Sequence, residues 1–91
     1  MNKSKLIKTL AQTATIPDRE AGDVTNTILE AMTEALANGD NIEIRGFGSF
    51  VVKNYAAYYG RNPKSGEKIR VNPKKLPFFK VSKELREKLG G

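Results

Sequence analysis

The residues of this chain best suited to chemistry form a basic turn, Gly-Arg-Asn-Pro-Lys-Ser-Gly, at residues 60–66. The cations of Arg61 and Lys64 can neutralise phosphates and release counterions, which makes binding to a polyanion strongly salt-dependent. Arg61 could also reach into a narrow minor groove, where the negative potential is enhanced. Pro63 carries a flat apolar ring that can wedge between base pairs. The turn therefore predicts contact with a nucleic-acid groove.

Two expected strands, residues 49–59 and 67–72, flank this turn and make it the tip of a two-stranded ribbon. A ribbon has dimensions that allow it to enter a DNA groove. The competing interpretation is an ordinary exposed hairpin, because Asn, Pro, Ser and Gly are common turn residues. That interpretation leaves unexplained the cations on or beside the arm, which are Arg61, Lys64, Lys68, Arg70, Lys74 and Lys75.

The charge of the chain is divided unevenly. Residues 1–40 carry a net charge of −2 and residues 41–91 carry +8, within a total of +6. Such asymmetry points to a polyanionic partner that meets the C-terminal half. A solvated surface that only keeps the protein soluble is the alternative.

The residue types that are missing lower the expectation of an enzyme. The 91 residues include no cysteine and no histidine, so thiolate metal sites, disulfides and neutral-pH imidazole catalysis are absent. No cofactor is expected. No apolar run reaches membrane-spanning length and the N-terminus lacks the apolar region of a signal peptide, so the expected location is the cytoplasm.

Two helices are expected to precede the strands. Asn2 is suited to cap a helix over residues 3–12, and Pro17 precedes a longer helix over residues 18–38, which Gly39 ends. Apolar residues recur along the second helix at spacings of three and four. They form a broad face that the short first helix cannot cover alone.

The second half of the chain reads as an antiparallel sheet and a final helix. Ile42 and Ile44 alternate with charged residues, and residues 46–48 then allow a tight bend. We expect Pro73 and Pro77 to interrupt strand pairing, a short strand over residues 78–81, and a helix over residues 83–89 capped by Ser82.

The size of the body predicts a dimer. Residues 53–75 form an arm that adds little to any core, and the remainder is smaller than about 70–80 residues, a size at which one core rarely supplies more than about 3–5 kcal/mol. Two-fold symmetry would then provide two arms able to clasp a duplex.

Weaker signals for anion binding lie outside the arm. The bend at Gly46 and Gly48 could offer backbone N–H groups to a phosphate, although a strand turn around a core Phe47 is the simpler interpretation. The helix starts at Asn2 and Ser82 each have a lysine beside them. The tyrosines at 55, 58 and 59 could stack on sugars or bases, or could stiffen the arm by cross-strand packing.

These motifs together resemble the HU/integration host factor family of bacterial DNA-bending proteins. The resemblance is carried by Gly-Phe-Gly-Ser-Phe at residues 46–50, the turn at residues 60–66, Ile69 and Val71, Phe79 and Leu85, and the Met-Asn-Lys start. It covers essentially the whole chain and is closest to HU.

The resemblance implies an α+β fold: an intertwined dimer with a helical base, a three-stranded antiparallel sheet extended into a long β-ribbon arm, and a short C-terminal helix. It implies one domain over residues 1–91, with a dimerisation region at 1–40, a body at 41–52 and 76–91, and a DNA-binding arm at 53–75. It also implies a non-enzymatic, nucleoid-associated protein that binds duplex DNA in the minor groove, bends it and compacts it.

The residues expected to act follow from this. On the arm, DNA contacts are expected from Lys53, Tyr55, Tyr58, Arg61, Asn62, Pro63, Lys64, Ser65, Lys68, Arg70, Asn72, Lys74 and Lys75, with Pro63 intercalating. On the body, phosphate contacts are implied for Lys3, Gly46, Gly48, Lys80, Lys83 and Arg86. The dimer core is expected to contain Val24, Ile28, Met32, Phe47, Phe50 and Phe79.

One departure from the family pattern concerns the base of the arm. Tyr55 and Tyr58 occupy positions where the family usually has basic residues, and Ser65 replaces the more usual threonine. Charge on this arm is therefore shifted toward the tip and the returning strand.

Three alternatives remain open from the sequence. The chain could be a sequence-selective subunit similar to integration host factor, acting in a heterodimer instead of a homodimer. It could be an RNA- or polyanion-binding module that uses its tyrosines as a stacking platform. An enzyme is the least favoured, because no paired carboxylates lie in a recognisable setting.

Overall fold

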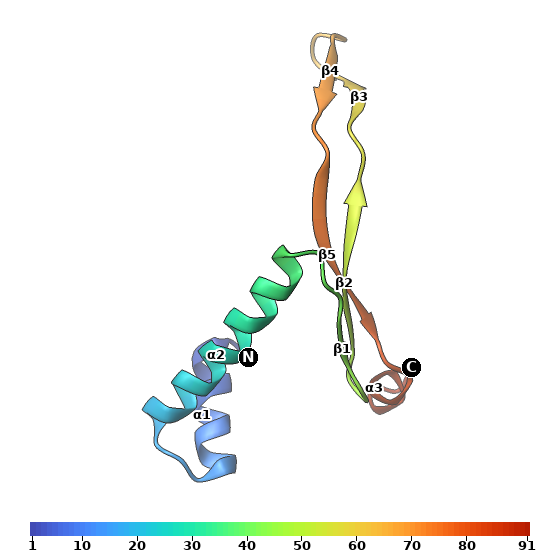
Figure 1. Cartoon of the computed structure of the whole chain (residues 1–91). Helices are drawn as coiled ribbons and strands as arrows, with labels where there is room; N and C mark the ends of the chain where they lie inside the picture. Colours follow the sequence, from blue (N-terminus) through green and yellow to red (C-terminus); the bar gives the residue numbers. More distant parts are fainter. The chain divides into compact units, whose positions relative to one another are not determined.

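The computed structural model describes all 91 residues and contains three helices and five strands. The chain divides into two compact units, Met1–Ala35 and Leu36–Gly91. The helices and strands of both units can be followed in Figure 1. The α+β class expected from the sequence is confirmed.

Two helices build the first unit. Helix α1 spans Lys3–Ala14, and α2 begins at Asp18 and continues to Ala37, at the start of the second unit. The Asn2 side chain caps α1 as expected, since its Oδ1 accepts a hydrogen bond from the Lys5 N–H at 2.9 Å. Helix α1 is two residues longer than expected and ends at Thr15, which adopts a left-handed conformation with φ of 55°. Asp18 and Glu20 in the first turn of α2 suit the positive end of the helix dipole.

This unit buries little of its apolar surface. Only Ala11, Ala21 and Thr25 are fully buried in it. Ile28 is 53% exposed and Val24 is 41% exposed. An apolar groove on this unit is lined by Leu6, Leu10, Thr25, Ile28 and Leu29. The broad apolar face predicted for the second helix is thus present, and the chain's own residues leave it uncovered.

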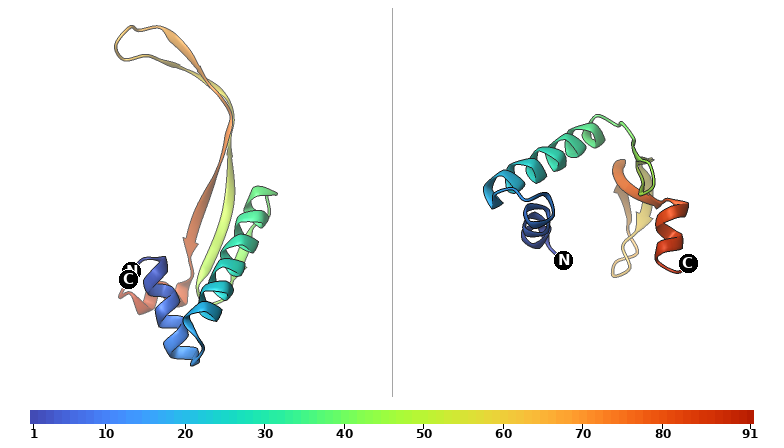
Figure 2. Two further views of the ribbon diagram at one scale, coloured as in Figure 1. Left: turned by 90° about the vertical axis from the view of Figure 1, so that its left-hand side faces the viewer. Right: turned by 90° about the horizontal axis from the view of Figure 1, so that it is seen from below.

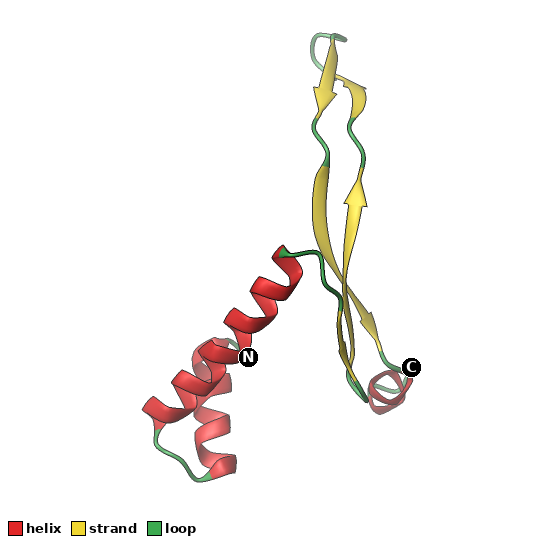
Figure 3. Cartoon of the chain, in the orientation of Figure 1, coloured by secondary structure: helices red, strands yellow, loops and turns green.

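A three-stranded antiparallel sheet forms the body of the second unit. Strands β1 (Ile42–Ile44), β2 (Gly48–Tyr55) and β5 (Lys74–Val81) lie in the order β1-β2-β5. Helix α3 (Lys83–Lys88) follows, and its Ser82 cap is confirmed because Ser82 Oγ accepts from the Leu85 N–H at 3.1 Å. Figure 3 distinguishes these strands from the helices by colour.

The bend between β1 and β2 positions an aromatic cluster. Gly46 has φ of 81°, a conformation that favours glycine. The Phe79 ring lies between Phe47 and Phe50, with ring-centre distances of 5.4 and 4.9 Å. Phe47 was expected in the core, yet 45% of its surface is exposed in the single chain.

The arm continues from β2 and β5 into a separate two-stranded ladder of β3 (Tyr58–Arg61) and β4 (Lys68–Val71). The two chain segments of the arm run beside one another to the tip (Figure 2). The expectation of one strand over residues 49–59 was wrong, because pairing is interrupted at Ala56 and Ala57 on one side and at Asn72 and Pro73 on the other. Alanine and proline are poor strand formers, which accounts for the place of the interruption.

The expected effect of Pro77 was also wrong. Strand β5 runs through this residue, which pairs with Val52, and it begins at Lys74 instead of residue 78. Strand β5 lies at the edge of the sheet, where the side of a proline that lacks an N–H can face away from the ladder.

No helix of the chain is both long enough and apolar enough to cross a membrane.

Candidate nucleic-acid interface

The tip of the arm is held by hydrogen bonds that converge on Asn62. Its backbone N–H donates to the Glu67 carbonyl at 2.8 Å, and its carbonyl accepts from the Gly66 N–H at 2.7 Å. Its side-chain Oδ1 accepts from the Lys64 N–H at 2.9 Å. These three bonds enclose Pro63, which is exposed at the turn. Asn62, expected to contact DNA, therefore also shapes the turn that presents the proline.

The two faces of the β3–β4 ladder differ in chemistry. Residues that pair directly across an antiparallel ladder point to the same face. Tyr59 pairs with Arg70 and Arg61 pairs with Lys68, so one face is cationic. The other face carries two apolar pairs, Tyr58 with Val71 and Gly60 with Ile69.

The same division holds along β2 and β5. Lys53, Lys74 and Lys80 share a face, because their partners are Leu76, Tyr55 and Ser49. The opposite face contains the packed pair Phe50 and Phe79. Lys75 is the one cation of these two strands on that opposite face, where it pairs with Asn54.

The register joins these two faces across the interruption. Two residues separate β2 from β3, and two separate β4 from β5, so the alternation of side chains keeps its phase. We call the resulting surface the cationic face. Its charged members are Lys53, Arg61, Lys68, Arg70, Lys74 and Lys80.

The tyrosines divide between the two faces. Tyr55 and Tyr59 lie on the cationic face, opposite Lys74 and Arg70. Tyr58 lies on the apolar face, and its ring is near Gly60: a Cβ built on that glycine would lie 3.8 Å from Tyr58 Cε2. Tyr59 was offered from the sequence only as a residue that could either stack or stiffen the arm, and it was left out of the expected DNA contacts, although it is 71% exposed. Strand alternation from Arg61 was the signal that could have identified it.

At the base of the arm, one cation of this face is held by an aromatic ring. The Lys53 ammonium lies 3.8 Å from the centre of the Phe78 ring. Farther along, Arg70 donates from Nη1 to Asn72 Oδ1 at 3.1 Å, whereas the bond from Arg61 Nη1 to the Gly66 carbonyl is long at 3.4 Å. Two predicted contact residues, Lys53 and Arg70, thus have their side chains oriented by neighbours within the arm.

Three of the body residues expected to meet phosphate, Gly46, Gly48 and Lys80, line a hollow beside the β1–β2 bend. Its lining includes Arg45, Gly46, Lys80 and Ser82, but also the carboxylates of Glu43 and Glu84. Gly48 is buried, whereas Gly46 is exposed. Lys83 and Arg86 lie on α3 and are exposed.

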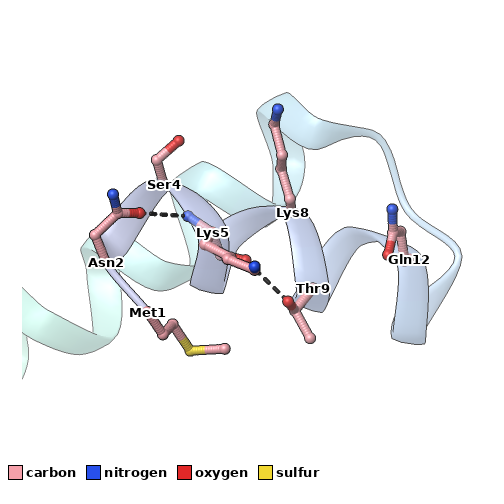
Figure 4. Close-up of a pocket in the computed structure, with 7 residues that line it drawn as sticks. All are labelled: Met1, Asn2, Ser4, Lys5, Lys8, Thr9 and Gln12. Atoms are coloured by element: carbon pink, nitrogen blue, oxygen red, sulfur yellow. Dashed lines mark hydrogen bonds between the residues drawn. The ribbon is translucent and has the colours of Figure 1, made fainter.

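Lys3 belongs to the other unit, where it is the first residue of α1. Figure 4 shows a neighbouring hollow on this helix, with the Asn2 cap and the side chains of Ser4, Lys5 and Lys8. Lys5 and Lys8 were not predicted as contacts. Their spacing along the helix places them on the same surface.

Comparisons with known proteins agree with this geometry. The family model described as "Bacterial DNA-binding protein" matches residues 1–90. Two curated relatives, the integration host factor subunit beta of Ralstonia nicotianae and that of Cupriavidus metallidurans, are each 51% identical over 92 residues and match 98% of this chain. The matched region spans 65% and 67% of their lengths, so this chain corresponds to about two thirds of each relative.

Solved structures give the same fold. The Anabaena HU–DNA cocrystal structure superposes with a TM-score of 0.86 at 37% identity, covering 98% of this chain and 97% of that one. HU from Thermotoga maritima gives a TM-score of 0.68 at 34% identity, with 98% of both chains covered.

Proposed function

The chain belongs to the family of bacterial DNA-binding proteins, and we propose that it binds duplex DNA in the minor groove with little sequence specificity, bends it and compacts it. The observation that carries this proposal is the cationic face, on which six cations of the arm and sheet share one side. Such a surface fits a phosphate backbone, and minor-groove readout is degenerate between A·T and T·A pairs. The likeness to an HU chain crystallised with DNA supports it.

The exposed apolar groups support a homodimer as the active form. Val24, Ile28 and Phe79 remain at least 38% exposed in one chain, and the groove beside Leu6 is apolar. Burying apolar surface contributes about 25 cal/mol per Å², so a second copy would stabilise both chains. We assign Val24, Ile28, Met32, Phe47, Phe50 and Phe79 to that dimer core, residues 1–40 to dimerisation and residues 53–75 to the arm.

In this proposal Pro63 enters a base step and kinks the duplex, while the arm cations hold the phosphates on either side. Kinking has an unstacking cost of a few kcal/mol, which contacts to the bent DNA offset. The exposed body cations Lys3, Lys80, Lys83 and Arg86, with the bend at Gly46 and Gly48, add phosphate contacts. The protein is then a non-enzymatic, nucleoid-associated component of the cytoplasm.

A salt series tests the function. Affinity for a duplex is measured at increasing salt, and about six to ten phosphate contacts give a log–log slope near −5 to −9. A nicked or gapped duplex should bind more tightly than an intact one of the same sequence, because bending it costs less. A flat slope contradicts the proposal. Stronger binding to single-stranded RNA of matched charge would favour the RNA-binding alternative.

A second candidate is a sequence-selective subunit that acts in a heterodimer. The identity of 51% to two integration host factor beta subunits favours it. Purifying the chain alone separates the candidates. A stable homodimer with similar affinity for unrelated duplexes supports the general DNA-bending function, whereas a chain that dimerises only with a second protein and prefers one site supports the subunit.

A further inference from the structure

We propose that Phe78 positions the Lys53 ammonium for phosphate contact at the base of the arm. The inference rests on the proposed DNA binding. Phe78 lies on β5, two residues from Leu76, and Leu76 pairs with Lys53. Lys53 and Phe78 are therefore diagonal neighbours on one face of the sheet, within reach of each other's side chains.

The geometry fits a cation–π interaction. The distance of 3.8 Å from Lys53 Nζ to the ring centre is well inside the range of about 6 Å over which such interactions act. The ring attracts the ammonium through its negative face, and the remaining N–H groups of the ammonium can still donate to a phosphate. Lysine otherwise loses much rotamer freedom when it is fixed in a complex. Holding it in place before binding reduces that loss.

The exposure of Phe78 argues against a role confined to the core. Phe78 is 45% exposed and lies on the face opposite the Phe50 and Phe79 pair. Tyr55, an uncharged residue, lies on the same face. Lys53 is thus the only cation that β2 contributes to this face, so the position of its ammonium matters for phosphate contact there.

The experiment is a double-mutant cycle in the full chain, with a gapped DNA duplex as the probe at fixed salt. Phe78→Leu keeps an apolar side chain but removes the ring, and we expect affinity to fall by about two- to fivefold per site. Phe78→Tyr keeps the ring and should restore binding. In a Lys53→Met background, Phe78→Leu should cause no further loss. Thermal unfolding of each variant reports folding.

Two results overturn the inference: an unchanged affinity in Phe78→Leu, or an equal loss with and without Lys53, which would indicate a purely structural role. A ring-current shift of the Lys53 ε-protons, measured by NMR without DNA and abolished in Phe78→Leu, reports the contact independently. Absence of that shift contradicts the positioning even when duplex binding is normal. Failure of the wild-type chain to bind any duplex instead contradicts the proposed function, and the inference with it.

Discussion

Gly48 lies so close to Phe79 that a Cβ built on the glycine would stand 2.6 Å from the ring atom Cζ, and 2.5 Å from the Lys80 carbonyl oxygen. Backbone cannot yield as a flexible side chain can. Gly48→Ala should therefore lower the free energy of unfolding by about 1–3 kcal/mol, a usual cost of overpacking. Urea denaturation at fixed protein concentration measures it.

The matched control for this substitution is Gly22→Ala in α2. A Cβ there meets only Ile7 Cγ2 at 4.0 Å, an ordinary contact. Alanine has the higher helix propensity, so this variant should gain up to about 1 kcal/mol. Equal destabilisation of both variants would show that the close approach at Gly48 is not the cause.

A stabilising change is expected at Thr15. This β-branched residue ends α1 with φ of 55°, a conformation that costs about 1–2 kcal/mol for residues other than glycine. Thr15→Gly should raise the free energy of unfolding by about 1 kcal/mol, since glycine is the usual residue at such a helix end. The control, Thr13→Gly inside the same helix, should be destabilising. A loss of stability at both positions would contradict the prediction.

At the tip, Pro63→Ala should reduce DNA bending more than affinity. The substitution removes the wedge but leaves the surrounding cations in place. Fluorescence transfer between dyes at the two ends of a duplex measures the bend angle. If that angle is unchanged, Pro63 serves only the turn.

Asn62→Ala should loosen the tip. It removes the Oδ1 acceptor of the 2.9 Å bond from the Lys64 N–H. Amide hydrogen exchange at Lys64 and Gly66 should quicken, and bending should fall with it, because Pro63 is presented by this turn. Ser65→Ala is the control, since its bond from the Glu67 N–H is long at 3.4 Å and should matter little. Similar exchange in both variants would argue against the role of Asn62.

The neighbouring lysines at 74 and 75 test the cationic face directly. Lys74 lies on that face, whereas Lys75, which was also expected to contact DNA, lies on the opposite one. Lys74→Gln should reduce the magnitude of the log–log salt slope by about 0.9 for each phosphate that the variant no longer neutralises, while Lys75→Gln leaves the slope nearly unchanged. Equal changes in the salt slope would mean that both faces of the sheet contact the phosphate backbone of the DNA.

The sequence predicted most of the fold because local signals agreed with it. Asn2 and Ser82 carry capping side chains, and both caps form. The passage of β5 through Pro77 was missed because it depends on which strand lies at the sheet edge. The interruption of the arm was missed although Ala56, Ala57 and Pro73, which are poor strand formers, mark its place.

The candidate site was predicted in composition but not in arrangement. The arm cations stand out as basic residues near a turn. The face on which each cation lies can be assigned only from the register of the two ladders, which places Lys74 and Lys75 on opposite faces. The cation–π contact between Lys53 and Phe78 joins residues 25 positions apart, which no local pattern reveals.

The equal spacing on the two sides of the arm has a consequence for how the arm can change in length. A single residue inserted at Ala56–Ala57 alone would shift the distal ladder by one position and turn the Arg61 side of the tip over. Insertions or deletions that preserve the cationic face must therefore add or remove the same even number of residues on each strand, because an odd number would reverse the alternation of the side chains beyond it. Relatives with longer or shorter arms should therefore differ from this chain by such numbers of residues in each strand. The same should hold for an engineered arm that binds a duplex through the same face.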